Sequence, residues 1–269
     1  MTIRLGFLGT GNMGAALAKG ISGREDLELI GFDPDQDRLQ AVCRETSMQA
    51  APNGEEVARN ADCLIVAVKP HLLETVVAPL AEIAPSGSCL LSIAAGVSMS
   101  TLRRVWRTDS PVVRTMPNTP SLYGRGVFAL CLDDPKLTAT QAALFQDVFT
   151  ALGAVYTLPE SQFDAFTALI GSGPAYVFAF MEALVEAGVS LGLARNQTTE
   201  MVNHLLGGAT HMAGQSSLHV SQLREMVSSP GGTTLAGLNH FDRQAFRGLV
   251  IDAVRAAHDR SRELGQQED

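Results

Sequence analysis

Residues 6–14 read Gly-Phe-Leu-Gly-Thr-Gly-Asn-Met-Gly, and the last six of them form a glycine-rich turn. The apolar residues up to this turn predict a strand, and Ala15–Gly20 predicts the start of a helix. Between a strand and a helix, a G-x-G-x-x-G turn holds the pyrophosphate of a dinucleotide. Gly9 allows the tight turn, Gly11 lets the backbone approach the phosphates, and Gly14 lets helix and strand pack closely. The alternative is a strand–turn–helix unit without a ligand.

The helix start supplies free N–H groups and a partial positive charge to the phosphates. A second strand, predicted at Leu27–Phe32, ends at Asp33. An acidic residue about 20 residues beyond the glycine turn can bond both ribose hydroxyls of the adenosine half. The predicted cofactor contacts of this region are Gly9, Gly11, Asn12, Met13 and Asp33.

The length and composition of the chain exclude several classes of function. The chain has 269 residues, 46% of them apolar, and a net charge of −8. This length predicts one large or two modest domains. Without a run of Lys or Arg, a nucleic-acid partner is not expected. Cys63 and Cys89 lie in apolar strand-like runs, which predicts buried free thiols, and the scattered His residues predict no metal site.

The sequence shows no targeting or membrane pattern. The N-terminus enters a strand without a signal-peptide pattern. The longest uncharged stretch, Ala165–Met181, is interrupted by Gly171–Pro174, so we expect it not to span a membrane. The expected setting is the reducing cytoplasm.

The first half of the chain alternates strands and helices, which predicts a Rossmann-like, doubly wound α/β sheet. Beyond Pro159 the periodicity is helical throughout. We therefore predict a dinucleotide-binding Rossmann-like domain at 1–159 and an all-α domain at 160–269. Strands are expected at 27–32, 63–68, 89–93, 111–115, 127–132 and 154–158, and helices at 36–45, 72–83, 100–106 and 138–152, with a further short helix capped by Asn53.

The helical half carries apolar surface that one small domain has no means to cover. Residues 246–257 form an apolar stripe at helical spacing. A long segment near Phe178, Phe180 and Met181 is apolar on too many sides for a surface helix of a lone domain. We interpret it as a dimer-forming element, with core packing of one domain as the alternative.

Three further loops fall where strands are expected to end, which is where open α/β sheets bind ligands. Lys69 is either a cofactor contact or a solvated lysine. Asn118 either orients the nicotinamide amide or a substrate, or caps its loop. The predicted cofactor contacts in these loops are Val68, Lys69, Pro70, Ala94, Ala95, Gly96 and Asn118.

Two small-residue insertions precede helices in the second half. They are Gly171–Pro174 and Ser228–Thr234, and each places free N–H groups at a helix start. The second adds the hydroxyls of Ser229, Thr233 and Thr234, so a carboxylate could bind there. An ordinary capped turn between helices is the alternative.

Taken together, these motifs resemble those of pyrroline-5-carboxylate reductases, in order and over nearly the full length. The resemblance implies a cofactor domain, a helical dimerisation domain, and dimers that often assemble into decamers of five dimers, with substrate held at the dimer interface. It also implies that Asn53 reaches the adenosine ribose and its substituent. The residues that carry it are Gly9–Met13, Ala67–Pro70, Ala94–Val97, Arg114–Pro120, Gly171–Tyr176 and Ser229–Thr234.

The implied reaction is hydride transfer from NADH or NADPH to C5 of 1-pyrroline-5-carboxylate, giving L-proline. A protonated imine is already electrophilic, so the enzyme needs mainly positioning and electrostatics. We expect Thr234, as the catalytic residue, to hydrogen-bond the ring nitrogen. The N–H groups around Ser229, Gly231, Gly232 and Thr233 are expected to bind the carboxylate.

Two positions depart from the family pattern. Many members place Ser, Asn or Arg after the second strand and use NADPH. Here Asp33, with Asp35 and Asp37 close behind, would repel a 2′-phosphate, which predicts a preference for NADH that Arg38 could offset. Met226 replaces an amide that helps hold the substrate in some members, so it is left out of the site.

Two rival functions remain. A β-hydroxyacid dehydrogenase also pairs a Rossmann domain with a helical one, but it needs a catalytic lysine in the linking helix. Residues Pro159–Ile170 contain no lysine. A non-catalytic NAD(H)-binding sensor would not need the loop at Ser229–Thr234.

Overall fold

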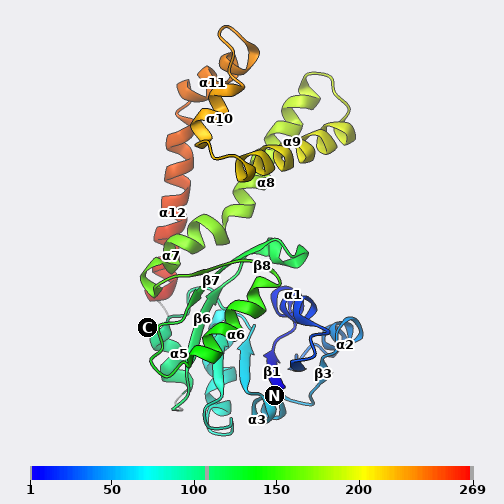
Figure 1. Ribbon diagram of the computed structural model, residues 1–269, viewed down its shortest axis with the longest axis vertical. Helices are drawn as coiled ribbons and strands as arrows, with labels where there is room; N and C mark the ends of the chain where they lie inside the picture. Colours follow the sequence, from blue (N-terminus) through cyan, green and yellow to red (C-terminus); the bar gives the residue numbers. More distant parts are fainter. Residues whose placement is uncertain (1, 107–108, 267–269) are drawn as a thin grey trace. The chain divides into compact units, whose positions relative to one another are not determined.

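The structure is a computed structural model that describes residues 2–106 and 109–266. The chain divides into two compact units (Figure 1). The first comprises Met1–Ser172 together with Ala257–Asp269, and the second comprises Gly173–Ala256. The first is an α/β unit and the second is helical throughout, so the predicted fold class is confirmed.

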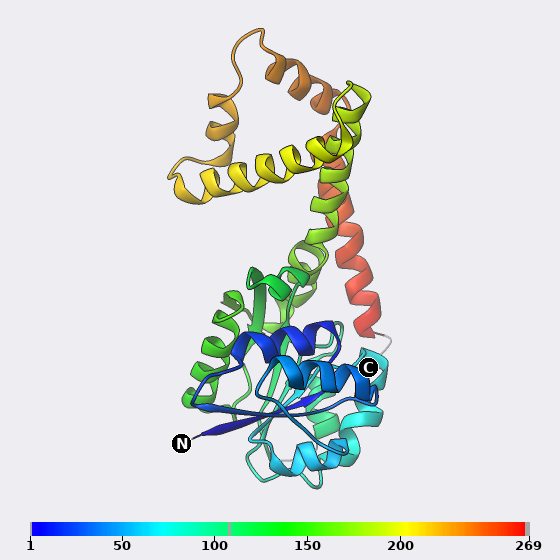
Figure 2. The same cartoon turned by 90° about the vertical axis from the view of Figure 1, so that its right-hand side faces the viewer.

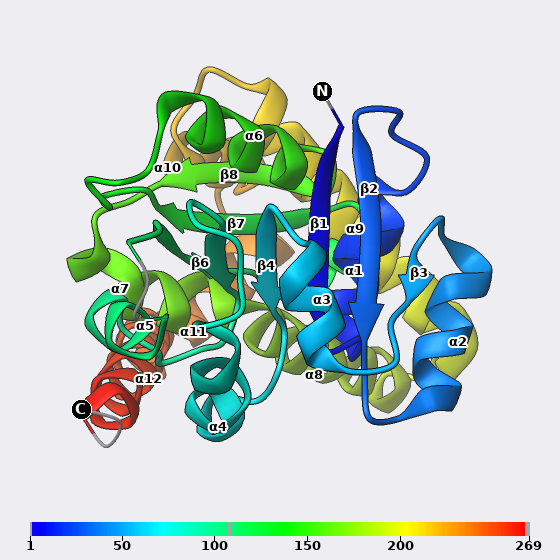
Figure 3. The same ribbon diagram turned by 90° about the horizontal axis from the view of Figure 1, so that it is seen from below.

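An eight-stranded sheet forms the centre of the first unit, in the order β3-β2-β1-β4-β5-β6-β7-β8 (Figure 3). Neighbouring strands run parallel except β6 and β7. The chain moves outward from β1 to β3 and then returns to β4 on the other side of β1. Ligands bind such sheets at this reversal, beyond the carboxyl ends of the strands. The strands are β1 (Ile3–Leu8), β2 (Leu27–Phe32), β3 (Gln49–Ala50), β4 (Cys63–Val66), β5 (Cys89–Ser92), β6 (Val112–Met116), β7 (Gly126–Cys131) and β8 (Gly153–Thr157).

Helices cover both faces of the sheet, which explains the near-continuous apolar strands. Phe7 packs with Leu17 in one core cluster, while its neighbour Leu8 packs with Val57 in the other. Successive strand side chains point to opposite faces, so each face receives its own core. One face carries α1 (Asn12–Ile21), α2 (Gln36–Glu45) and α6 (Ala139–Thr150), and the other carries α3 (Gly54–Asn60), α4 (Leu73–Val77) and α5 (Met99–Trp106).

Two predicted elements differ from the structure. The helix expected at 72–83 is divided into the 3₁₀ turn η1 (Pro70–Leu72), the short α4, and the 3₁₀ turn η2 (Ala78–Leu80). Pro79 lies in the first turn of η2, and its missing N–H interrupts a longer helix there. The strand expected at 63–68 ends at Val66, so Ala67–Pro70 is a loop at the carboxyl edge.

The second unit has almost no core of its own. Among residues Gly173–Ala256, all of which the structure describes, only Val185, Thr198 and Val202 are buried. Phe178 is 62% exposed, so the alternative that this helix packs in the core of one domain is wrong for the single chain. Helices α8 and α9 contact each other at Gly188 and Thr198, near the turn that joins them, and Figure 2 shows α9 as a long helix directed away from α8. The helices are α8 (Gly173–Ser190), α9 (Arg195–Gln215), α10 (Val220–Met226), α11 (Thr233–Arg243) and the first part of α12 (Phe246–Gln266).

The expected interruption at Gly171–Pro174 is small. The turns η4 (Glu160–Gln162) and α7 (Phe163–Phe166) lead into a π-helical turn, η5 (Thr167–Gly171), and only Ser172 bends before α8. Pro174 falls in the first turn of α8, where a missing N–H has no cost. Among the described residues, Glu160–Ser190 is therefore one helical stretch that is long and apolar enough to cross a membrane by length and composition alone.

Candidate active site

The glycine turn has the geometry that a dinucleotide pyrophosphate requires. Gly9 has a φ of +94°, and a Cβ there would lie 2.8 Å from the carbonyl oxygen of Ala67. A Cβ at Gly14 would collide with the carbonyl oxygen of Gly9. At Gly11, by contrast, a Cβ would meet no atom within 4 Å among the described residues. The backbone is therefore packed tightly behind the turn and open in front of it.

The N-terminus of α1 supplies the charge complement for phosphate. Gly11 is the N-cap residue, and its carbonyl accepts the N–H of Ala15. The N–H groups of Asn12 and Met13, in the first turn, lie before any intrahelical acceptor. The chain therefore offers N–H donors and the positive end of a helix beside the open space at Gly11. These residues fit a dinucleotide.

Asp33 is buried and holds the glycine turn to the end of β2. Its Oδ2 accepts the backbone N–H of Thr10 at 2.7 Å and the Thr10 hydroxyl at 3.1 Å. Its Oδ1 accepts the N–H of Asp35 at 2.9 Å. The side chain is 5% exposed, and its three hydrogen bonds show that the carboxylate shapes the turn.

The Arg38 guanidinium pairs with two carboxylates. Its Nη2 lies 3.0 Å from Asp35 Oδ2, and its Nη1 lies 3.8 Å from Asp33 Oδ2. Asp35 also caps α2 by accepting the Arg38 N–H at 3.1 Å. Two carboxylates thus share one guanidinium, and the cluster keeps a negative balance beside the expected adenosine.

Sequence reasoning missed one residue of this turn and one residue that contacts it. Thr10 was not among the predicted contacts, although it provides both donors to Asp33 Oδ2. Ser121, in the 3₁₀ turn η3 (Thr119–Tyr123), places its hydroxyl 3.2 Å from the Met13 sulfur. A hydroxyl between the first two glycines, with an acid ending the next strand, is the signal that would have indicated the first contact.

The other predicted cofactor loops lie at the carboxyl edge of the first unit, as their strand ends require. Lys69 is exposed at the start of η1, with Val68 and Pro70 half-buried beside it. Ala94 is buried, Ala95 is exposed, and Gly96 has a φ of +82°. Gly96 also faces Leu264, at the end of α12, where a Cβ on the glycine would lie 3.8 Å from the leucine Cβ.

Asn118 is engaged within the protein. Its Oδ1 accepts the Val127 N–H at 2.8 Å, and its Nδ2 donates to the Ile170 carbonyl at 3.3 Å. These bonds tie the loop after β6 to β7 and to η5, which is what the loop-capping alternative expects. A Cβ at Gly171 would lie 2.8 Å from Met116 Cε, so this junction is also tightly packed.

Asn53 caps α3, as the sequence predicted. Its Oδ1 accepts the Glu56 N–H at 2.8 Å. The residue is exposed, and its Nδ2 donates to no group that the structure describes. The amide can therefore cap the helix and still donate outward.

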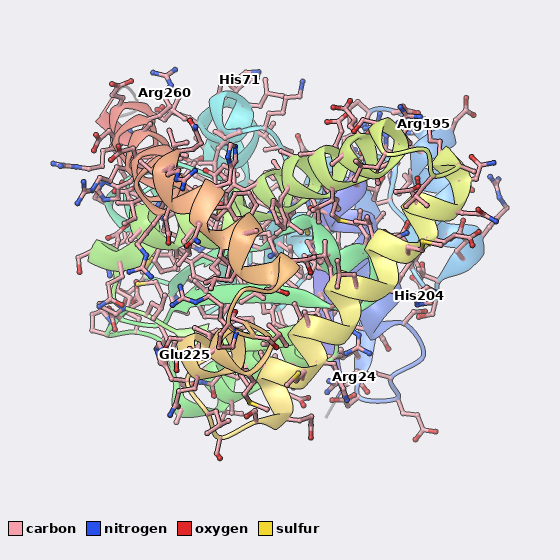
Figure 4. All side chains as sticks on the ribbon, turned by 90° about the horizontal axis from the view of Figure 1, so that it is seen from above. Arg24, His71, Arg195, His204, Glu225 and Arg260 are labelled. Atoms are coloured by element: carbon pink, nitrogen blue, oxygen red, sulfur yellow. The ribbon has the colours of Figure 1, made fainter. Side chains whose placement is uncertain are left out.

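The predicted substrate loop lies in the second unit. Gly231 has a φ of +71°, and the Gly232 N–H donates to the Ser229 carbonyl at 3.0 Å. Gly232 therefore sets the shape of the turn with its N–H already paired. Helix α11 begins at Thr233, and Thr233 and Thr234 are exposed with first-turn N–H groups. Figure 4 shows this unit with its side chains, including Glu225 on the neighbouring α10.

Comparisons with known proteins cover both halves of the chain. The family model described as pyrroline-5-carboxylate reductase dimerisation matches residues 160–264. The model described as NADP oxidoreductase, coenzyme F420-dependent, matches residues 4–96. A pyrroline-5-carboxylate reductase of Synechocystis is 35% identical over 269 residues, which cover 99% of this chain and 100% of the relative.

Solved structures agree with these relatives. A Plasmodium falciparum pyrroline carboxylate reductase with NADP bound has a TM-score of 0.86 at 32% identity, covering 98% of both chains. A pyrroline-5-carboxylate reductase from Coxiella burnetii has a TM-score of 0.88 at 31% identity, covering 98% of this chain and 99% of the other. The similarity therefore includes the fold and extends over the whole length.

Proposed function

This chain belongs to the pyrroline-5-carboxylate reductase family, and on that premise we propose that it reduces 1-pyrroline-5-carboxylate to L-proline with a hydride from NAD(P)H. The observation that carries the proposal is the full-length match at 35% identity. The bound dinucleotide supplies the hydride. The protein chain supplies position and charge.

One assay tests the activity. Oxidation of NADH or NADPH is followed at 340 nm (about the absorbance maximum of reduced nicotinamides) with and without 1-pyrroline-5-carboxylate. Substrate-dependent oxidation that yields proline is the expected result. Cofactor binding without turnover would instead indicate the sensor. Turnover of a β-hydroxyacid but not of the imine would indicate the dehydrogenase, which the lysine-free segment Pro159–Ile170 disfavours.

Within this function, NADH is the proposed preferred cofactor. Asp33 and Asp35 outnumber the single Arg38 that pairs with both, so a 2′-phosphate would meet net repulsion there. A 2′-hydroxyl can donate to the remaining acceptor capacity of Asp33. The other proposed contacts are the glycine turn, the carboxyl-edge loops and Asn53. A higher kcat/KM with NADPH than with NADH would contradict the preference.

The substrate is proposed to bind the start of α11. Backbone N–H groups near Ser229, Gly231 and Thr233 bind its carboxylate, and Thr234 hydrogen-bonds the ring nitrogen. Gly232 contributes mainly by holding the turn, because its N–H bonds Ser229.

Thr234→Val should lower kcat/KM by about 10–1000-fold, the range for losing one positioned donor. Thr199→Val is the matched control, since the Thr199 hydroxyl on α9 already bonds the Arg195 carbonyl. Wild-type kinetics in Thr234→Val would remove the residue from the site.

The proposed assembly is a homodimer formed through residues 160–269, with a decamer of five dimers as its higher form and residues 1–159 as the cofactor domain. The exposed apolar side chains of the second unit and the dimerisation family match support this. The stretch Glu160–Ser190 is long and apolar enough to cross a membrane, and we propose that its apolar side chains contact the partner subunit instead. The proposed location is therefore the cytoplasm. Light scattering measures the mass, and vesicle flotation should recover no protein with lipid.

A further inference from the structure

The loop that joins β5 to α5 is covered on one side by the end of α12. Gly96 lies in the middle of this loop, and a Cβ there would lie 3.8 Å from the Leu264 Cβ. A Cβ at Gly265 would lie 3.6 Å from the Gly96 carbonyl oxygen. These residues belong to the same compact unit. The last turn of α12 therefore lies against the backbone of a predicted cofactor loop.

A hydrogen bond between distant parts of the chain holds this end of α12 in place. The Ser261 hydroxyl donates to Asp164 Oδ1, on α7, at 2.7 Å. Ser261 is 5% exposed, and hydrogen bonds to an ionised acceptor are stronger than neutral ones. Residues three and four positions apart share a face of a helix, so Ser261 lies on the same face as Leu264 and Gly265.

The segment that carries Asp164 also holds the loop directly. Phe163 of α7 belongs to the same core cluster as Ala94 and Val97. Just before α7, Glu160 Oε1 accepts the N–H of Met99 at 2.6 Å, where the loop enters α5. The bond from the Ser261 hydroxyl therefore joins the end of α12 to the segment that already packs against the loop.

The strand order places this loop on the nicotinamide side of the proposed cofactor. The glycine turn follows β1, and Asp33 follows β2 on one side of it. Strand β5 is the second strand from β1 on the other side, about 10 Å away at the usual strand spacing. A dinucleotide with its adenosine at Asp33 and its pyrophosphate at the glycine turn extends its nicotinamide half toward β4 and β5.

We propose that Ser261 is a positioning residue of the cofactor site, which holds the loop Ala94–Val97 in its binding conformation by bonding the end of α12 to Asp164. The inference rests on the proposed function, because that function makes this loop a cofactor contact. A loop that is already ordered loses less entropy when a ligand binds. Without the bond, the end of α12 can move away from Gly96, and the loop must then be ordered by the cofactor.

Calorimetric titration of the full-length protein with NADH and with ADP tests the proposal. Ser261→Ala should raise the Kd for NADH by about 3–10-fold, which is the effect of one hydrogen bond. ADP lacks the nicotinamide half, so its Kd should stay within about twofold of the wild-type value, as for a distant and independent site. A general loosening of the first unit would instead weaken both ligands.

Substitutions at Asp164 test the bond itself. Asp164→Ala should reproduce the effect of Ser261→Ala, and the double variant should add nothing, because each change removes the same contact. Asp164→Asn keeps an acceptor oxygen for the hydroxyl and should retain the wild-type affinity for NADH. Arg260→Ala is the matched control on the same turn of α12, since Arg260 pairs with the exposed Glu263 (Figure 4). It should change neither Kd.

The outcomes separate this inference from the proposed function. An unchanged Kd for NADH in Ser261→Ala, in a protein whose wild type binds both ligands, would overturn the inference alone. Equal weakening of NADH and ADP would also overturn it, because the bond would then only stabilise the first unit. A wild type that binds neither ligand would contradict the proposed function together with the inference.

Discussion

The charge of Asp33 can be separated from its shape. Asp33→Asn removes the carboxylate charge and keeps the size of the side chain. A carboxylate and a phosphate charge about 4 Å apart interact by about 1 kcal/mol in water and about 4 kcal/mol at an effective dielectric of 20. The Asp33 side chain is 5% exposed, but the half-exposed Arg38 guanidinium that pairs with it offsets part of its charge, so we place the interaction between these limits, at about 1.4–2.7 kcal/mol. We expect the ratio of kcat/KM for NADPH to that for NADH to rise by about 10–100-fold.

The same substitution should also weaken the turn. Asp33 accepts three hydrogen bonds, two from Thr10 and one from the Asp35 N–H. An amide has one acceptor oxygen, so its NH₂ group must face a donor. The free energy of unfolding should fall by about 1–3 kcal/mol. The unfolding measurement shows how far the turn is weakened. The kinetics show whether kcat/KM falls for both cofactors together or whether only their ratio changes.

Asp37→Asn is the matched control. Asp37 is exposed in the first turn of α2, and its substitution changes the net charge by the same amount. We expect its cofactor ratio to stay within about twofold of the wild type, because a solvated charge is screened. Initial rates at several concentrations of each cofactor, with saturating imine, give the ratio. An unchanged ratio in Asp33→Asn would refute the argument and leave Asp33 with only its role in holding Thr10.

Three further substitutions test separate parts of the structure. Gly14→Ala should raise the NADH dissociation constant by at least about tenfold, measured by fluorescence titration, because its Cβ collides with the Gly9 carbonyl. Arg114→Met should lower the free energy of unfolding by about 1–3 kcal/mol in a denaturant titration, because Glu160 loses its 2.9 Å partner in a partly buried position. Phe178→Asp should dissociate the dimer in sedimentation velocity, since it puts a charge on an apolar contact surface. A stable dimer would place the interface elsewhere.

The sheet could be predicted from sequence because each strand is marked locally. Apolar runs such as Cys63–Val66 and Cys89–Ser92 are buried on both faces, so no polar alternation obscures them. The helix at 72–83 was harder, since Pro79 lies inside an otherwise helical pattern and shortens it. The hydrophobic periodicity indicates which side chains face the core, but it does not indicate where the helix ends.

Individual side-chain roles were less predictable than the loops that carry them. The loop after β6 is where sequence reasoning placed it, yet Asn118 uses both ends of its amide on Val127 and Ile170. Those partners are distant in the chain, and only the fold brings them together. The place of Asp33 at the end of β2 could be predicted from the strand before it, whereas its bond to Thr10 was missed because that bond depends on side-chain direction.

The second unit shows a limit of a different kind. Ordering the backbone costs about 1–2 kcal/mol per residue, and burial of apolar surface must offset that cost. Within Gly173–Ala256 three side chains are buried, while Phe178, Leu249 and many other apolar residues are exposed. A single chain with this burial has too little core to fix five helices, so the ordering of this unit must be linked to association. The apolar stripes that sequence reasoning identified are therefore the cores of an assembly, and only the surface left uncovered in one chain distinguishes them from the core of a monomer.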